Sequence, residues 1–206
     1  MNYLKFREKL LPMGVFSISH VNIFFPGFDK RRLVEWQEKG YIKKIINKWY
    51  VFSEIDLSTE SLYGIGNKIY TPSYVSLESA FRYYNLIPEG VFTTTSISTK
   101  KTTFFYSSIG QFSYRSLQSR LFFGYRINRE GNFHFMIADL EKSLLDFLYL
   151  NPRYISVEDF ESIRPNPSVL FQIKWDLMND YLKGFGNKAL EKRTEGLKKY
   201  IDYVRN

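Results

Sequence analysis

The succession of helix-ending and strand-forming residues in the first fifty positions restricts the fold of this chain more than any other feature. Prolines and glycines divide this segment into three short helical patterns, at residues 2–11, 17–25 and 30–39. Residues 41–52 are instead rich in β-branched and aromatic side chains around a turn-forming Asn-Lys pair, and predict a β-hairpin. Three short helices followed by a hairpin is the order of a winged helix-turn-helix, which we therefore expect here.

The middle of the chain has the pattern of a β-sheet. Several strand-like runs between residues 91 and 137 are separated by short polar or glycine-containing breaks, which indicate hairpin connections and a largely antiparallel sheet. Before them, residues 72–85 have apolar positions at helical spacing. Together with the helices that follow, this predicts the α+β fold class.

The last third of the chain predicts mainly helices, at about residues 138–150 and 168–204. In the first of them, Lys142 and Asp146 have the i,i+4 spacing of an ion pair on a helix surface. The predicted fold is thus an N-terminal winged helix-turn-helix, then a mixed α/β domain that ends in helices.

Charge is distributed unevenly along the 206 residues, whose net charge is +8. Residues 1–52 hold ten Lys or Arg and four Asp or Glu, residues 183–206 hold seven and three, and the middle is nearly neutral. A concentrated positive field favours polyanionic partners. Because the change of charge coincides with the end of the predicted hairpin, we place one domain at residues 1–56 and a second at residues 57–206.

A winged helix-turn-helix presents the start of its third helix to the base edges of the DNA major groove. Arginine suits guanine because it donates two parallel hydrogen bonds, and glutamate accepts from the amino group of cytosine. Lysines on the hairpin suit phosphates. Alternatively, the fold serves a protein contact and the basic residues are a solvated face. The predicted DNA-contacting residues are Lys30, Arg31, Arg32 and Glu35 on the third helix, Lys43, Lys44 and Lys48 on the hairpin, and Ser19 at the start of the second helix.

The sequence gives no positive indication of catalysis. It has no cysteine, which excludes disulfides, zinc–thiolate sites and thiol nucleophiles. Its two histidines, His20 and His134, are far apart in the chain and lack ligand spacing. We therefore expect no catalytic residue, no cofactor, no metal and no enzymatic activity. Acidic residues cluster in two groups, Asp139, Glu141 and Asp146, and Glu158, Asp159 and Glu161. A metal site needs carboxylates that converge on one ion, whereas Glu141 and Asp146 are five residues apart and diverge on a helix. Helix capping and solvation explain Asp139 and Glu141 more simply.

No segment has the composition of a membrane-spanning helix. The longest early uncharged run, residues 10–28, contains two prolines and two glycines as well as polar side chains. A spanning helix needs about 20 predominantly apolar residues. We therefore expect a cytoplasmic protein that makes no membrane contact.

Five sequence blocks follow one another between residues 72 and 150. They are Pro72–Ala80, Tyr84–Glu89, Thr93–Ile97, Phe123–Tyr125 and Ala138–Leu150. As an ordered set they resemble the AbiEi family, the antitoxins and transcriptional regulators of AbiE-type (type IV) toxin–antitoxin systems in phage defence. The resemblance extends from the predicted winged helix to at least Leu150 and is weaker in the C-terminal helices.

The resemblance implies a function for each part of the chain. The winged helix would bind inverted repeats of operator DNA in its own promoter, and the α/β domain would act as the antitoxin. The functional partner would be a nucleotidyltransferase-like toxin, which such antitoxins counteract without a stable complex. Two alternatives remain: a solitary winged-helix regulator without a toxin partner, and a metal-dependent nuclease that uses the acidic groups.

Overall fold

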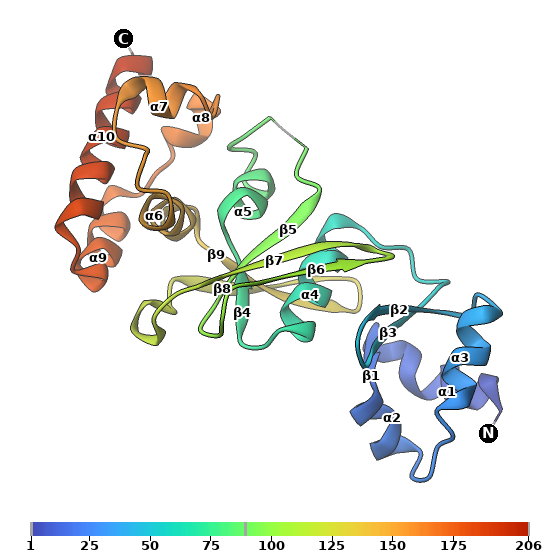
Figure 1. Ribbon diagram of the computed structural model, residues 1–206. Coiled ribbons are helices and arrows are strands. Elements are labelled where there is room, and N and C mark those ends of the chain that lie inside the picture. The colour runs from blue at the N-terminus through green and yellow to red at the C-terminus, as the bar shows by residue number, and fades with distance from the viewer. Residues whose placement is uncertain (1, 89, 206) are drawn as a thin grey trace.

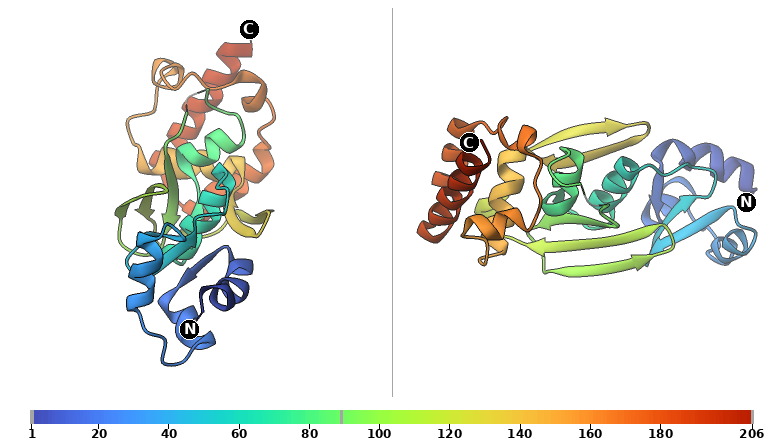
Figure 2. Two further views of the ribbon diagram at one scale, coloured as in Figure 1. Left: turned by 90° about the vertical axis from the view of Figure 1, so that its right-hand side faces the viewer. Right: turned by 90° about the horizontal axis from the view of Figure 1, so that it is seen from above.

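The computed structural model describes residues 2–88 and 90–205, and their fold is α+β, as predicted (Figure 1). The chain forms one sheet of three strands and one of six. The molecule is elongated: the N-terminal helices lie at one end, the C-terminal helices at the other, and the larger sheet between them (Figure 2). The residues predicted to contact DNA are therefore remote from the C-terminal helices.

Residues 2–52 form three helices, a short 3-10 turn and an antiparallel sheet. In chain order these are α1 (Tyr3–Leu10), η1 (Leu11–Met13), β1 (Val15–Ser17), α2 (Ile18–Phe24), α3 (Arg31–Glu38), β2 (Ile42–Ile46) and β3 (Trp49–Phe52). The structure confirms the three helices and the hairpin, and adds β1, which pairs with β3 in the order β1-β3-β2. Local signals set these boundaries: the Ser17 hydroxyl caps α2, and Gly40 follows α3 with φ of 71°.

An aromatic cluster holds the three helices against one face of the small sheet. Phe6 of α1 is fully buried, and the centroid of its ring lies 4.6 Å from that of Trp36 and 5.4 Å from that of Phe16. Leu33 and Trp36 bury one side of α3 in this cluster. Burial of each such side chain stabilises the fold by about 1.5–3 kcal/mol. The other side of α3 is therefore left facing outward.

The small sheet lies between two apolar cores, so its two faces differ. Tyr50 and Phe52 face the aromatic cluster of the N-terminal helices. Val51, which lies between them, belongs instead to a buried cluster with Ile65 and Phe112 from the second part of the chain. The two predicted domains thus share a core, and the boundary near residue 56 stays a prediction.

A six-stranded mixed sheet forms the centre of the molecule. Its strands are β4 (Ser73–Val75), β5 (Thr93–Ser98), β6 (Thr103–Ser107), β7 (Gly110–Ser116), β8 (Tyr125–Glu130) and β9 (Phe133–Ala138), in the order β6-β7-β5-β4-β9-β8. The pairs β5–β7 and β4–β9 are parallel, and the other three are antiparallel. The prediction of a largely antiparallel sheet over residues 91–137 is therefore confirmed only in part: β6–β7 and β8–β9 are antiparallel, but β5–β7 is parallel and the sheet is mixed. The sheet is mixed because β7 inserts between β5 and β6, and because β4, within the predicted helix 72–85, joins the sheet.

Helices cover both faces of the large sheet and form the C-terminal end. They are α4 (Thr59–Ile69), α5 (Leu77–Tyr83), α6 (Leu140–Leu150), α7 (Val157–Glu161), α8 (Pro167–Leu170), α9 (Trp175–Phe185) and α10 (Lys188–Arg205), with a 3-10 turn, η2, at Ser119–Leu121. On one face, the Tyr114 hydroxyl donates to the Gly66 carbonyl of α4 at 2.7 Å. A Cβ at Gly64 would lie 2.8 Å from the Phe133 Cβ, so glycine permits the close approach of α4. On the opposite face, α6 meets Tyr74 of β4.

Lys142 and Asp146 of α6 form a fully buried ion pair, so the prediction of a surface pair is wrong. The reason is that α6 runs between the sheet and the C-terminal helices (Figure 1). Lys142 Nζ also donates to the Tyr74 hydroxyl at 2.7 Å, and the Asp146 carboxylate accepts from the hydroxyls of Tyr74 and Ser76, both at 2.9 Å. Burial lowers the pKa of Lys142 and raises the pKa of Asp146, and each charge partly offsets the shift of the other.

Candidate nucleic-acid interface

The start of α3 carries three cations on the outer side of the N-terminal fold. Lys30, which precedes the helix, and Arg31 are exposed, and Arg32 is half-buried. Leu33 and Trp36 hold the other side of the helix in the aromatic cluster. The structure therefore brings the three predicted cations together and directs them away from the core.

Arg31 is already engaged by a neighbouring carboxylate. Its Nε lies 3.1 and 3.0 Å from the two oxygens of Asp29, and its Nη2 lies 2.9 Å from Oδ2. Asp29 Oδ1 also accepts from the backbone N–H of Arg31 at 3.0 Å, and these hydrogen bonds lower the pKa of Asp29. Because the pair is exposed, water screens it and a phosphate or base can replace the carboxylate at little cost.

Arg32 and Glu35 differ in their freedom to meet a ligand. Among the residues that the structure describes, none forms a hydrogen bond or ion pair with the Arg32 guanidinium. Glu35 Oε1 accepts from Lys39 Nζ at 2.6 Å, and this hydrogen bond lowers the pKa of Glu35. The predicted cytosine contact of Glu35 therefore requires this pair to open, whereas Arg32 needs no rearrangement of partners.

The two lysines within the hairpin point to opposite sides of the small sheet. The register pairs Lys43 with Val51 and Lys44 with Tyr50, and neighbouring strand residues face opposite ways. Lys43 thus lies on the side that faces the second part of the chain, where it and Glu54 line a shallow depression. Lys44 lies on the side of the N-terminal helices. The structure does not bring these two predicted phosphate contacts to one surface.

Lys48 and Ser19 come together at the other end of the hairpin. Lys48 occupies the β2–β3 turn with φ of 68°, and its carbonyl accepts from the backbone N–H of Ile18 at 3.0 Å. Ser19 is the next residue of α2 and, like Lys48, is exposed. The turn and the start of α2 therefore form one continuous surface that carries two of the predicted contacts.

His20 has a structural role at the start of α2. Its Nδ1 accepts from the backbone N–H of Ser17 at 3.2 Å, while the Ser17 hydroxyl accepts from the His20 N–H at 3.3 Å. This reciprocal capping box requires an unprotonated Nδ1. Burial, and secondly the charge of Lys68, lower the pKa of His20.

Acidification should weaken the fold through His20. The unfolded chain, with a histidine pKa of about 6.5, takes up the proton more readily than the folded one. Stability that is present above that value is therefore lost as the pH falls below it. We expect the melting temperature to drop between about pH 7.5 and 5.5, and to drop less in His20→Gln, because glutamine keeps the acceptor. His134→Gln, at an exposed position, is the control; equal drops in His20→Gln and the unaltered protein would contradict the role given to His20.

The acidic groups considered for a metal site have separate structural partners. The Asp139 carboxylate accepts from the Tyr181 hydroxyl at 2.9 Å, and the buried Glu141 carboxylate accepts from the backbone N–H of Lys174 at 2.8 Å. Asp159 accepts from the backbone N–H of Ser156 at the start of α7. Within residues 2–88 and 90–205, no three His, Asp or Glu side chains gather as metal ligands would.

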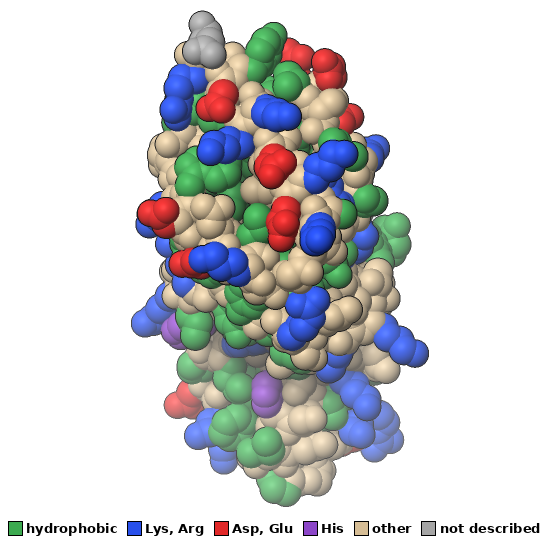
Figure 3. Space-filling view, turned by 90° about the vertical axis from the view of Figure 1, so that its left-hand side faces the viewer, with side chains coloured by type: hydrophobic (Ala, Val, Ile, Leu, Met, Phe, Trp, Pro, Cys, Tyr) green, Lys and Arg blue, Asp and Glu red, His purple; other side chains and the backbone are tan. Residues whose placement is uncertain are grey.

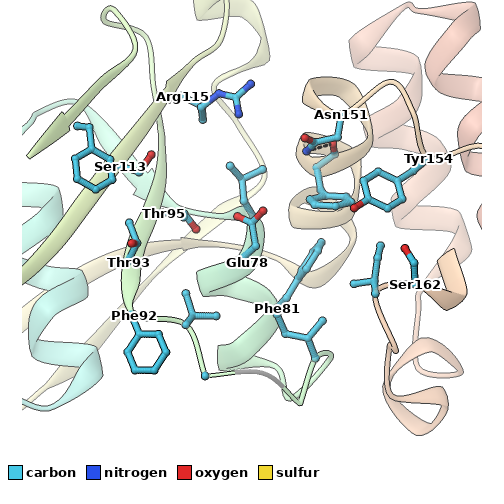
Figure 4. A pocket seen from close by; sticks show the side chains of 17 residues that line it. Glu78, Phe81, Phe92, Thr93, Thr95, Ser113, Arg115, Asn151, Tyr154 and Ser162 are labelled. Carbon is cyan, nitrogen blue, oxygen red and sulfur yellow. Dashed lines mark hydrogen bonds between the residues drawn. The ribbon is translucent and has the colours of Figure 1, made fainter. Parts of the chain in front are cut away.

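Among the described residues, a cavity on the large sheet is lined by none of the predicted DNA contacts and by neither histidine (Figure 4). Its charged lining residues are Glu78, at the start of α5, and Arg115, on β7. Glu78 lies within the block Pro72–Ala80, but neither residue belongs to a ligand-binding motif, and the two are far apart in the sequence. No pattern in the sequence could therefore have identified this site.

The surface over the C-terminal helices carries both signs of charge. Figure 3 shows Lys and Arg side chains interspersed with Asp and Glu over this end of the molecule. One of the basic residues, Arg193, is buried and donates to the carbonyls of Ala189 and Leu148. The net charge of this end therefore does not form an unbroken basic face.

Comparison with known proteins does not assign the chain to a family. No model of a known protein family matches it, and no curated protein matches it. Among the described residues, no helix is both long enough and apolar enough to cross a lipid bilayer.

Proposed function

We propose that the protein is a DNA-binding transcriptional autorepressor and the antitoxin of an AbiE-type toxin–antitoxin operon. In this proposal residues 1–56 are a winged helix-turn-helix that binds inverted repeats in the promoter of its own operon. The observation that carries the proposal is the start of α3, where Lys30, Arg31 and Arg32 gather on the outer side of a helix anchored by Leu33 and Trp36.

Element order and charge support DNA as the partner of this surface. The helices α1, α2 and α3, followed by the β2–β3 hairpin, have the order of a winged helix-turn-helix. Basic residues outnumber acidic ones ten to four in residues 1–52. Arg32, whose guanidinium is unpaired within the described part of the chain, is available to a base edge. Lys48 lies at the tip of the hairpin, where a wing meets phosphates.

The antitoxin role rests on the resemblance of the second part of the chain to the AbiEi family. The blocks that carry this resemblance include β4, the start of α5, β5 and α6. These elements lie together in space: Tyr74 and Ser76 of the first block donate to Asp146 of the last. The proposed partner is a nucleotidyltransferase-like toxin, counteracted without a stable complex, and no catalytic role is proposed for this chain.

Co-expression with the neighbouring gene tests the antitoxin role. The toxin candidate is expressed from an unrelated promoter, with and without this protein, and growth is recorded. Rescue of growth supports the proposal, and no rescue by soluble, folded protein contradicts it. In parallel, a DNA fragment from upstream of the gene is titrated against random DNA of equal length; equal affinity for both would contradict operator recognition.

Two hairpin lysines are expected to contribute phosphate contacts to this DNA binding. Lys44→Ala and Lys48→Ala should weaken the binding of operator and random DNA alike. Each should make the slope of log affinity against log salt shallower by about 0.9. Lys43→Ala is the matched control, since Lys43 lies on the opposite side of the sheet from Lys44. A loss confined to operator DNA, with the salt slope intact, would contradict the assignment.

A further inference from the structure

A cavity of about 630 Å³ opens on the face of the large sheet that α4 does not cover (Figure 4). Its sheet side is a row of Phe104, Ser113 and Thr95, which lie side by side across β6, β7 and β5. The opposite side is formed by the C-terminal end of α6 and the segment after it, which include Tyr154. This volume is within the range of about 300–1,000 Å³ that small-molecule sites occupy.

Aromatic side chains line the cavity from its floor to its rim. Phe81 and Phe147 are buried at the floor, with ring centroids 5.1 Å apart. At the rim, Phe104 is 41% exposed and Phe92 is 90% exposed, so both rings are open to contact. Aromatic side chains of this kind can stack against a flat aromatic ring of a ligand. This stacking does not depend on which nucleobase is present, because every nucleobase has a π-face.

Two opposite charges face this cavity without pairing. Glu78 and Arg115 are both half-buried. In the part of the chain that the structure describes, neither makes a hydrogen bond or ion pair, with the other or with any other side chain. Charged groups withdrawn from water are normally paired. Figure 4 shows the Glu78 carboxylate in the middle of the cavity and the Arg115 guanidinium above it.

The lining polar groups define the ligand chemistry. A guanidinium is matched by a phosphate, to which it donates two parallel hydrogen bonds. A carboxylate accepts from an exocyclic amino group of a base. The Ser113 hydroxyl also lines the cavity and has no hydrogen-bond partner among the described residues. The ligand that fits this lining has an anionic group for Arg115, an N–H donor for Glu78 and a flat ring for the aromatic side chains. A nucleotide combines all three.

We propose that this cavity binds a nucleoside monophosphate whose base carries an amino group, with the phosphate on Arg115 and the amino group on Glu78. The site is distinct from the start of α3 and does not depend on DNA binding there. A free nucleotide and a nucleotide within a single strand share this chemistry. Among the described residues, the lining holds one cation and one carboxylate, and a single cation favours the free nucleotide over a polyanionic strand.

Calorimetric titration of the full-length protein with AMP tests the site. Adenosine, which lacks the phosphate, and IMP, which lacks the amino group, are the comparison ligands. AMP should bind about tenfold or more tightly than adenosine, which lacks the phosphate. Arg115→Met should remove this difference while the affinity for adenosine stays unchanged. Glu78→Gln should remove the preference for AMP over IMP, which has a carbonyl in place of the amino group. The retained adenosine affinity shows that the Arg115 variant still folds.

Arg82→Met is the matched control, since Arg82 is exposed on α5 and does not line the cavity. It should change none of these affinities. A hexa-adenylate RNA that bound more tightly than AMP, with the same dependence on Arg115, would keep the site and assign it to single strands. Absence of AMP binding at millimolar concentration, or AMP binding that Arg115→Met leaves unchanged, would overturn the proposal. Arg32→Ala should leave AMP binding intact, so this result is separable from failure of operator binding.

Discussion

Replacing Asp146 with alanine should lower the free energy of unfolding by about 3–5 kcal/mol, the usual cost of leaving a buried charge without its partner. Asp146 and Lys142 are both fully buried, and the carboxylate also accepts from Tyr74 and Ser76. Without it, the Lys142 ammonium and two hydroxyls lose their acceptor between the sheet and the C-terminal helices. Urea denaturation, with the slope compared between variants, measures the change.

The double variant Lys142→Met with Asp146→Leu separates charge from packing. It removes both charges and keeps similar volume, so it should be more stable than Asp146→Leu alone. Asp180→Ala is the control, because its i,i+3 pair with Lys183 is exposed and exposed pairs contribute little. If Asp146→Ala cost no more than Asp180→Ala, the pair would not be holding α6 in place.

The N-terminal fold could be predicted because its signals are local. The Ser17 cap, the glycine after α3 and the turn at Lys48 each fix the backbone within a few residues. The strand β1 lacks such a signal. It has only three residues, and its pairing with β3 depends on Tyr50 and its neighbours far along the chain.

The helix predicted over residues 72–85 shows how tertiary contacts override a local pattern. Val75 has helical spacing relative to the apolar residues after it, but it lies in β4, where it pairs with Ser96 of β5 and Ile137 of β9. Three residues are too few to show the alternation of a strand. The helix starts only at Leu77, which has φ of 57°. Leucine rarely adopts this left-handed conformation, so the sequence does not predict it.

The sequence does not show which charged side chains are buried. The i,i+4 spacing of Lys142 and Asp146 describes a surface pair and a buried pair equally well. Their burial follows from the position of α6 between the sheet and the C-terminal helices, which many distant residues determine. Likewise, Glu78 and Arg115 line one cavity only because α5 packs on the face of the sheet from which the Arg115 side chain of β7 projects. The predicted DNA contacts could be grouped from the sequence without knowledge of distant tertiary contacts, because α3 and the hairpin are neighbours in the chain.

Operator binding should weaken by about 1–3 kcal/mol in Arg31→Ala or Arg32→Ala if each arginine makes a bidentate guanine contact. Among residues 2–88 and 90–205 Arg32 has no hydrogen-bond or ion-pair partner to leave, whereas Arg31 must first leave Asp29. We therefore expect the larger loss for Arg32→Ala. Fluorescence titration of operator and random DNA measures both affinity and preference. Lys192→Ala, an exposed lysine on α10 at the far end of the molecule, is the control for removal of one positive charge.

Asp29→Asn, at the same site, is expected to strengthen operator binding rather than weaken it. Asparagine can still accept from the Arg31 backbone N–H, so this hydrogen bond at the start of α3 is kept. The substitution removes a negative charge from a surface proposed to meet phosphates and releases the Arg31 guanidinium. Operator affinity should therefore rise in Asp29→Asn, and Arg31→Ala should cost more in that background than in the unaltered protein. If affinity and sequence preference stayed unchanged in all three variants, Arg31 and Arg32 would not read bases, and the basic face of α3 would have to serve another contact.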